Sequence, residues 1–354
     1  MPVIDADTHV DESESTWERL SGGPYARYIP PTISSRPDEA KRAGLSSVTS
    51  RWWLVEGRLQ NRAVRDEVIH PPRVRRELED VPGRVAHMDE MGVDVQVIFP
   101  TFFIRYNTAN AEAEWALTST YNRWLAEKCA GTNGRLRWAP VLPLLQPEKA
   151  AEELRWAKAN GACGFFKRGY DLDRPVSDPH FFPVYEEASA LGLPVCIHTG
   201  HPLPGREWDR GFPIMQALMD LVEAGVPAKF PKLRFGFIEA GASWLPYSLS
   251  QRGANKRAAL RGSGSRLPQL FELEPELFRS NRFFVTIDPI DDIEYLLKFG
   301  TEDSLMIGTD YSHTDISANL SALDEVRTWA DQGRISQAVA RKVLETNPQA
   351  FYGL

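Results

Sequence analysis

Residues 1–10 read MPVIDADTHV, an apolar start that runs directly into three polar side chains, Asp5, Asp7 and His9. The apolar residues predict a buried β-strand, and side chains at positions i, i+2 and i+4 of a strand share one face. Three polar groups on a buried face are costly unless something binds them. Imidazole and carboxylate together are a ligand set for transition metals, so the stretch predicts one side of a metal site. His9 and Asp7 are the expected ligands, and Asp5, two residues deeper, is expected to support them without binding the metal. The alternative is a strand end whose aspartates cap nearby backbone N–H groups.

The composition of the 354-residue chain is that of an ordinary soluble globular protein, with 42% hydrophobic and 25% charged residues. Its net charge of −7 gives no basic patch of the kind that nucleic-acid binding needs, and no apolar run is long enough to span a membrane. The three cysteines, Cys129, Cys163 and Cys196, show no CxxC spacing. We therefore expect free thiols, a reducing cytoplasmic location, and neither a nucleic-acid nor a membrane partner.

Residues 11–78 form a long irregular stretch between the first strand and the first regular helix. The stretch contains the pairs Pro30-Pro31 and Pro71-Pro72, but also the strand-like run RWWLV at residues 51–55. Loops of this length inside a compact protein are usually functional or disordered, and the aromatic residues argue against disorder. We predict a folded insertion over residues 11–78 that covers the face where the first strand ends.

From about residue 80 onward, short apolar strands alternate with helices. Strands are predicted at 94–100, 136–144, 163–168, 194–200, 233–239, 282–288 and 304–310, which with the first strand makes eight. Helices are predicted at about 80–92, 108–130, 147–161, 179–191, 213–225 and 290–298, from residue 243, and in the C-terminal portion, with a loosely ordered Gly/Ser/Arg-rich loop around 252–266.

Alternating strands and helices indicate a parallel sheet. Eight repeats predict an α/β fold of the (β/α)8 TIM-barrel type, with residues 1–354 as a single domain. A doubly wound open sheet is the alternative, but no Gly-rich phosphate fingerprint follows any strand.

Polar residues gather at the C-terminal ends of the predicted strands, where the active site of a TIM barrel lies. A lone histidine at such an end is more often structural than a ligand, Glu239 could cap the next helix, and Lys167 could extend from the rim. The convergence of several strand ends on one rim favours a metal site over these separate explanations. The residues at or just past strand ends are Asp7, His9, Glu12, Lys167, Arg168, His198, His201, Glu239, Asp288, Asp310 and His313.

Motifs along the whole chain, from residue 3 to residue 354, resemble the amidohydrolase superfamily. They are Asp7-x-His9, Ile-His198-Thr-Gly, Glu-x-Gly-x-x-Trp244, Gly-Thr-Asp310-Tyr-Ser-His313 and Glu-Thr-Asn347-Pro-x-x-Phe-Tyr-Gly. The most similar branch is the amidohydrolase-2 group related to aminocarboxymuconate-semialdehyde decarboxylase. The resemblance implies a metal-dependent hydrolase-type TIM barrel.

The resemblance also implies a divalent ion (zinc, manganese or iron) with the ligands Asp7, His9, His198 and Asp310. Asp7 stands where this branch usually carries His or Glu. Glu239 lies in the region of the sixth strand where the decarboxylases commonly carry a histidine. Many relatives hold two ions bridged by a carbamylated lysine, which would be Lys167 here, with Glu12 as a further carboxylate. One ion and two ions both remain open.

The predicted reaction is hydrolysis of a small organic substrate, carboxylate or aromatic, by a water whose pKa a metal ion lowers from 15.7 to about 7. Asp310 would take the proton of the water and return it to the leaving group. His313, His201 or Glu239 would orient or polarise the reacting carbonyl.

Three other functions compete with this hydrolysis. The first is non-oxidative decarboxylation of an aromatic or unsaturated acid. The second is a dinuclear iron or Mn/Fe enzyme, acting as an oxygenase or as an ester or thioester hydrolase. The third is a partner subunit of such an enzyme, with a degenerate site.

Substrate binding is predicted for side chains of the insertion and the rim, namely Arg51, Trp52, Arg105, Arg168 and His201. Arginine suits a carboxylate because its guanidinium pairs bidentately. Alternatively, Trp52 and its neighbour Trp53 form a small core of the insertion itself. A homodimer or a related hetero-oligomer is expected, because relatives are often dimers.

Overall fold

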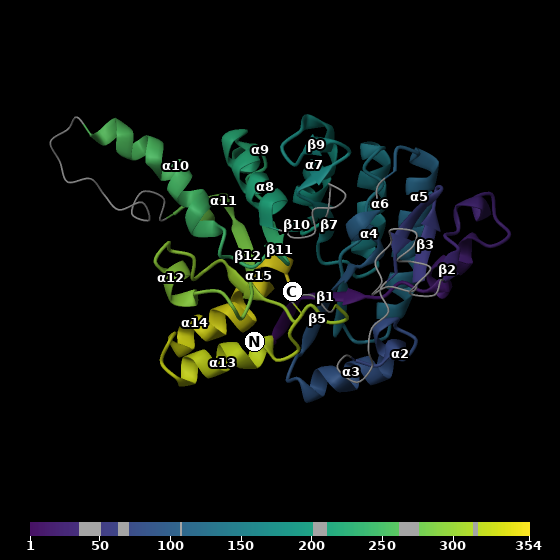
Figure 1. Ribbon diagram of the computed structural model, residues 1–354, viewed down its shortest axis with the longest axis horizontal. Coiled ribbons are helices and arrows are strands. Elements are labelled where there is room, and N and C mark those ends of the chain that lie inside the picture. The colour runs from purple at the N-terminus through teal and green to yellow at the C-terminus, as the bar shows by residue number, and fades with distance from the viewer. Residues whose placement is uncertain (35–50, 63–70, 107, 201–210, 262–275, 314–317) are drawn as a thin grey trace.

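The computed structural model describes residues 1–34, 51–62, 71–106, 108–200, 211–261, 276–313 and 318–354. The protein is a mixed α/β structure whose strands lie at the centre with helices around them (Figure 1). The N-terminus packs beside the C-terminal segment, since the amino group of Met1 lies 3.7 Å from the carboxylate of Glu345. Among the described residues, no helix combines the length and apolarity needed to cross a membrane.

Eight parallel strands form two sheets, of three strands in the order β1-β5-β6 and five strands in the order β13-β12-β11-β10-β7. Each lies within a predicted strand or overlaps it. The predicted strand at 136–144 is shorter than expected, because Pro140 and Pro143 follow β6 and cannot donate to a ladder. The bounds are β1 (Ile4–Val10), β5 (Val95–Pro100), β6 (Leu136–Trp138), β7 (Phe165–Arg168), β10 (Val195–His198), β11 (Phe235–Ile238), β12 (Phe283–Ile287) and β13 (Leu305–Ile307).

The two sheets meet at both of their edges. Between β6 and β7 there are two isolated parallel bridges, Trp138 with Ala162 and Val141 with Phe166. Between β13 and β1, the N–H of Asp310 donates to the carbonyl of Asp7 over 2.9 Å. The strands therefore follow one another in a cyclic order that returns from β13 to β1.

Gly308 marks the closest approach at the junction of β13 and β1. A Cβ atom on Gly308 would lie 2.4 Å from the Cβ of Asp7 and 2.7 Å from its backbone nitrogen. Any larger residue would push the two strands apart, so a glycine is required where the first and last strands meet.

Helices lie between successive strands, close to their predicted positions. Local capping explains several starts: the side chain of Asn110 accepts the N–H of Glu112 and of Ala113, and Pro147 occupies the first turn of α6. The bounds are α3 (Val81–Glu90), α4 (Phe102–Arg105), α5 (Ala111–Cys129), α6 (Pro147–Ala159), η3 (Pro179–Phe181), α7 (Phe182–Leu191), α8 (Gly211–Glu223), α9 (Val226–Lys229), α10 (Leu245–Leu260), α11 (Leu277–Asn281) and α12 (Ile293–Leu297).

The C-terminal helices are α13 (Ala322–Asp331), α14 (Gln337–Arg341), the single π-turn η5 (Lys342–Thr346) and α15 (Asn347–Tyr352). A short hairpin, β8 (Tyr170–Asp171) and β9 (Arg174–Pro175), follows β7. The Gly/Ser/Arg-rich loop predicted around 252–266 is wrong in its first part, because α10 continues to Leu260. Residues 262–266 lie outside the described residues.

The segment between β1 and α3 contains a small antiparallel sheet with strand order β2-β3-β4. Its aromatic residues pack onto the helix that follows β5: the rings of Trp17 and Trp53 lie 5.1 Å and 6.2 Å from that of Phe102. Gln60 adds a hydrogen bond to the carbonyl of Phe102. The elements are η1 (Glu14–Leu20), η2 (Ala26–Tyr28), β2 (Thr32–Ser34), β3 (Arg51–Val55), β4 (Arg58–Asn61) and α2 (Arg73–Arg76).

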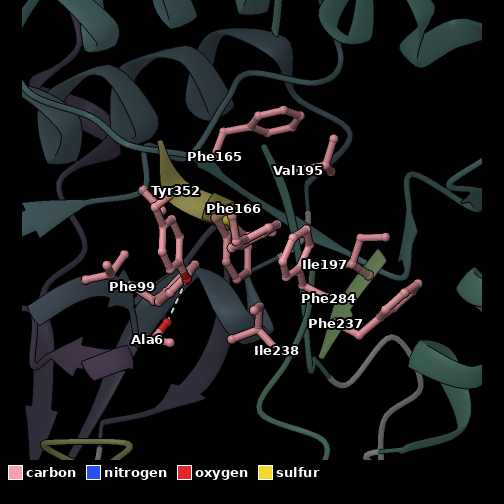
Figure 2. Close-up of a cluster of buried hydrophobic side chains, with 14 of the residues drawn as sticks. Ala6, Phe99, Phe165, Phe166, Val195, Ile197, Phe237, Ile238, Phe284 and Tyr352 are labelled. Atoms are coloured by element: carbon pink, nitrogen blue, oxygen red, sulfur yellow. Dashed lines mark hydrogen bonds between the residues drawn. The ribbon is translucent and has the colours of Figure 1, made fainter. Parts of the chain in front are cut away.

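The core is a single cluster of hydrophobic side chains around the strands (Figure 2). The C-terminal helix α15 takes part in it, because the hydroxyl of Tyr352 donates to the carbonyl of Ala6 over 2.6 Å, as drawn in Figure 2. A Cβ on Gly236 would lie 2.3 Å from the ring of Phe351. The last helix therefore packs against both β1 and β11. The cysteines are buried free thiols, as expected.

Candidate metal centre

A β-bulge in β1 decides which of its polar side chains reach the candidate metal centre. Asp5 pairs with Gln96 and Thr8 pairs with Ile98, so three steps on β1 oppose two on β5. Such an extra residue reverses the alternation of side chains beyond it. The prediction that Asp5 shares one face with the next two polar residues of the strand is therefore wrong.

Asp5 belongs to a separate buried network that connects β1 to β13 and α3. Its carboxylate accepts the N–H of Thr309 (2.8 Å), the hydroxyl of Thr309 (2.7 Å) and the side-chain amide of Gln96 (3.2 Å). Arg84 donates to the side chain of Gln96 and to the carbonyl of His9, both over 2.9 Å. This network fixes the backbone next to Asp310, so Asp5 supports the site without entering it.

Four residues from three strands bring ligand atoms together at the C-terminal ends of the strands: Asp7, His9, His198 and Glu239. Their ligand atoms all lie within 4.8 Å of one another, and all four side chains are buried. Nε2 of His9 lies 3.4 Å from Oδ1 of Asp7 and 3.2 Å from Oε2 of Glu239. Nε2 of His198 lies 3.1 Å from the same Glu239 oxygen.

The tautomers of the two histidines follow from their backbone partners. Nδ1 of His9 lies 3.0 Å from the carbonyl of Pro100, and Nδ1 of His198 lies 2.8 Å from the carbonyl of Thr199. A carbonyl can only accept, so each Nδ1 carries a hydrogen and donates it, and each Nε2 faces the neighbouring carboxylates. The two Nε2 atoms are 3.2 Å apart. Two imidazole nitrogens and two carboxylates that face one another form a site suited to a cation, either a proton or a metal ion.

A second group shares His9 and Glu239 and adds Asp310 and His313. Nδ1 of His313 lies 2.7 Å from Oδ1 of Asp310 and 3.8 Å from Oε2 of Glu239. The imidazoles of His9 and His313 stack with a centroid distance of 3.7 Å. On its other side, Nε2 of His313 lies 3.0 Å from the hydroxyl of Thr101. Thr101 directly follows β5, and sequence analysis overlooked it although it also comes just past a strand end.

Two of these residues have strained backbones. Glu239 and Asp310 follow β11 and β13 with φ values of 58° and 50°, a left-handed conformation that residues other than glycine rarely adopt. Such strain costs on the order of 1–3 kcal/mol and is concentrated at functional sites. Here it turns two carboxylates from the strand ends toward His9.

The electrostatics of the site also match a bound cation. Burial alone would lower the pKa of His9, but the neighbouring carboxylates of Asp7 and Glu239 raise it to about 10. Burial alone would raise the pKa of Asp7, but His198 and His9 hold it well below its usual range. Oδ1 of Asp7 is buried and makes no hydrogen bond. Carboxylates and imidazoles in this arrangement fit a divalent transition metal.

Glu12 lies outside both groups. Its carboxylate accepts the N–H of Thr101 (3.1 Å) and of Phe102 (2.8 Å), at the start of α4. Burial raises its pKa to about 8. Glu12 thus binds a helix start, where sequence analysis expected an additional metal ligand.

Lys167 is also placed away from the ligands. Its ammonium lies 3.0 Å from the carboxylate of Asp171 and 3.7 Å from the ring centroid of Phe181, and burial lowers its pKa. The preceding residue, Phe166, is the one whose ring approaches His198, at 5.5 Å. Successive side chains of a strand point to opposite faces, so Lys167 faces α7 and does not bridge the two groups as a carbamylated lysine would.

The predicted substrate-binding residues lie in different settings. Arg51 lies 3.8 Å from Glu14, Trp52 is buried in β3, and Arg105 is exposed on α4. His201 lies outside the described residues. Arg168 donates to Asp171 and to the carbonyl of Tyr106, and it lines a pocket.

This pocket, which we call the aromatic pocket, has a volume of about 30 Å³, and none of the candidate metal ligands lines it. It is lined by Phe103, Tyr106, Glu114, Leu142, Phe166 and Arg168, among others. Phe166 connects it to the metal centre through its contact with His198. Burial raises the pKa of Glu114 to about 7. No sequence signal distinguished Glu114 from the exposed acidic residues of α5.

Comparisons with known proteins find relatives along most of the chain. A family model described as "Amidohydrolase" matches residues 4–354. A gamma-resorcylate decarboxylase from Polaromonas sp. is 25% identical over 316 residues, covering 80% of this chain and 90% of the relative. A 2-amino-3-carboxymuconate-6-semialdehyde decarboxylase from Dictyostelium discoideum is 23% identical, covering 64% of this chain and 60% of the relative.

Solved structures share the fold. An amidohydrolase from Mycobacterium avium subsp. paratuberculosis superimposes with a TM-score of 0.75 at 20% identity, covering 99% of both chains. A 5-carboxyvanillate decarboxylase from Novosphingobium aromaticivorans, complexed with manganese and a nitrobenzoic acid, gives a TM-score of 0.67 at 20% identity, covering 100% of this chain and 96% of the other.

Proposed function

The chain belongs to the amidohydrolase family, and from this premise we propose that it is a manganese-dependent decarboxylase of a small aromatic acid built on a (β/α)8 barrel. The observation that carries the proposal is the convergence of carboxylates and imidazole nitrogens, with two Nε2 atoms 3.2 Å apart. Decarboxylation, the first alternative of the sequence analysis, is preferred over hydrolysis because the relatives are named as decarboxylases of such acids.

Asp7, His9, His198 and Asp310 would hold the ion, with Glu239 as a further carboxylate. A divalent cation bound there would supply a Lewis acid for the oxygens of the substrate. Pro100 and Thr199 contribute through their carbonyls, which hold the two imidazoles in the required tautomer and orientation.

Decarboxylation replaces a carboxylate on a ring carbon by a proton. The ring carbon takes a proton, the bond to the carboxyl carbon breaks, and its electron pair restores the ring as CO2 leaves. The pair of Asp310 and His313, 2.7 Å apart, is placed to hold this proton and deliver it. Thr101 keeps His313 in position through its contact with Nε2.

The edge of the substrate ring would reach the aromatic pocket, whose volume is about 30 Å³. Phe166 offers a face beside His198, and Phe103 and Tyr106 extend the apolar wall. Arg168 provides the positive charge at the edge of this pocket, where it would attract an aromatic acid. Its guanidinium is held by Asp171, which limits the entropy lost on binding.

Hydrolysis remains the second candidate because of Glu239. The two ligand groups share this carboxylate, and a carboxylate can bridge two ions that together activate a water. Such a dinuclear site would be built without Lys167.

Metal analysis together with CO2 release tests the proposal. We expect one equivalent of a divalent ion and release of CO2 from 2,6-dihydroxybenzoate or 5-carboxyvanillate, the acids named for the relatives, or from a similar hydroxybenzoate. Protein without bound metal would overturn both candidates. Two equivalents of metal, with ester cleavage and no CO2 release from any acid, would favour the hydrolase.

A further inference from the structure

A second cavity lies at the opposite ends of the strands from the metal centre. It has a volume of about 230 Å³ and is lined by residues that directly precede β11, β12 and β13, such as Arg234, Arg282 and Ser304. The candidate metal ligands instead lie toward the C-terminal ends of their strands or just past them. Residues that precede parallel strands and residues that follow them lie at opposite ends of the sheet, so the cavity is separate from the candidate metal centre.

The floor of the cavity is apolar. Phe278, Phe283 and Phe284 line it and are at most 9% exposed. Phe284 belongs to the cluster of buried hydrophobic side chains shown in Figure 2. Ala350 of α15 forms part of the wall and is exposed at the surface. An apolar floor of this kind favours a ligand with a hydrocarbon body over a small inorganic ion.

Two guanidinium groups beside this floor are held by backbone carbonyls, whereas the carboxylate in the lining, Asp303, pairs with Arg279 and Lys342. Arg282 donates to the carbonyls of Leu233 (2.9 Å) and Pro227 (2.6 Å), and Arg234 donates to that of Phe351 (2.7 Å). Among the ion pairs of the described residues, none includes either arginine. Burial lowers the pKa of both guanidinium groups, as expected where positive charges are desolvated without a counterion.

The other cations of the cavity differ in their pairing. Arg279 lies 2.7 Å from Asp303 and 3.6 Å from Glu276, so its charge is balanced. Lys232 is exposed at the mouth of the cavity and takes part in no ion pair among the described residues. The cavity therefore has a surplus of positive charge, although the chain as a whole carries −7.

We propose that this cavity is a binding site for a small organic anion. Its hydrocarbon body packs against Phe278 and Phe284, and its carboxylate lies near Arg234, Arg282 and Lys232. The volume is below the range of about 300–1,000 Å³ that is typical of pockets for drug-sized ligands, so the ligand is a single ring or a short chain. The arginines keep their backbone hydrogen bonds and attract the anion by charge.

The test uses 4-bromobenzoate with the intact, metal-loaded protein. Calorimetry on the wild type is expected to show a binding event in addition to any at the metal centre. In crystals soaked with the same acid, the anomalous signal of bromine is expected between Phe278 and Phe284. A signal confined to the metal centre would overturn the proposal.

Two variants locate the binding in solution. Ala350→Trp fills the cavity from its exposed wall and is expected to weaken the additional binding at least tenfold, with unchanged metal content. Lys232→Glu is expected to weaken it about threefold, whereas the matched control Lys298→Glu, an exposed lysine after α12, leaves it unchanged. Equal affinity in wild type and Ala350→Trp would contradict the proposal.

Competition with inorganic phosphate tests whether the cavity recognises the organic part of the ligand or its charge alone. If phosphate competes with 4-bromobenzoate at equal concentration, the cavity recognises charge alone and the organic part of the proposal is wrong. The outcome does not depend on the reaction at the metal centre, since the cavity shares no residue with it.

Discussion

Asp5 and Asp7 lie two residues apart on one strand and are both buried, but they have opposite surroundings. Asp5 accepts hydrogen bonds from Thr309 and Gln96, whereas Oδ1 of Asp7 accepts none and faces the imidazoles of His9 and His198. A buried carboxylate with hydrogen-bond donors strengthens a fold, and one without them is costly until a cation binds. The same residue type therefore supports structure on one side of β1 and ligand binding on the other.

The largest effect is expected from a substitution at the candidate metal centre. Asp310→Asn should lower turnover by about 10³-fold or more, because an amide cannot exchange the proton that the reaction needs. The free energy of unfolding should stay close to that of the wild type. Steady-state CO2 release and thermal denaturation measure the two quantities. Turnover within twofold of the wild type would remove Asp310 from the mechanism.

A change at Asp5, in the structural network, should lower the stability of the fold more than the turnover. Asp5→Ala leaves the N–H and hydroxyl of Thr309 without their acceptor, so we expect a loss of about 2–4 kcal/mol in the free energy of unfolding, measured in urea. Asp5→Asn keeps one acceptor oxygen and should lose less. If the two variants are equally stable, the hydrogen bonds of Asp5 contribute little to stability.

Adding or removing the metal should again distinguish residues of the candidate metal centre from those of the Asp5 network. An ion present at about 100 times its Kd stabilises the folded state by about 2.7 kcal/mol. Adding manganese to metal-free protein should therefore raise the melting temperature of the wild type and of Asp5→Asn, but not that of His198→Ala. A similar rise in His198→Ala would show that the stabilising ion binds elsewhere.

The smallest effect is expected at His87, which contacts the outer side of the Asp310–His313 segment. Its Nδ1 lies 3.1 Å from the hydroxyl of Tyr311, and burial lowers its pKa below the ordinary value of 6.5. The unfolded state therefore binds the proton more readily, so stability should fall as the pH drops below about 6.5. His87→Gln should show a weaker fall in urea denaturation at pH 5 to 7. The effect is small because the imidazole is only half-buried.

Much of the arrangement could be predicted from the sequence because strand ends carry a clear signal. Apolar runs located the eight strands, and the polar residues after them named Asp7, His9, His198, Glu239, Asp310 and His313, which the structure brings together. Whether they bind a metal stays a prediction, as do the cytoplasmic location and the dimer.

The rest depended on geometry that one sequence does not contain. A bulge leaves no mark in a pattern of alternating residues, so the face of Asp5 was predicted wrongly, although its expected supporting role agrees with its hydrogen bonds. The side of β7 on which Lys167 lies depends on register, and the ion pair with Asp171 could not be foreseen. Glu12 was misplaced because its partners, Thr101 and Phe102, are about 90 residues away.

The junction of β1 with β13 also affects how the protein is made. His9 and Asp310 are about 300 residues apart in the sequence, so at about 5–20 residues per second roughly 15–60 s pass between their synthesis. During this time one edge of β1 has no partner strand, and an unpaired apolar edge is prone to aggregation. Asp7 and His9 place polar groups on that strand, so we expect two side chains of the candidate metal centre also to make the strand a poorer template for aggregation.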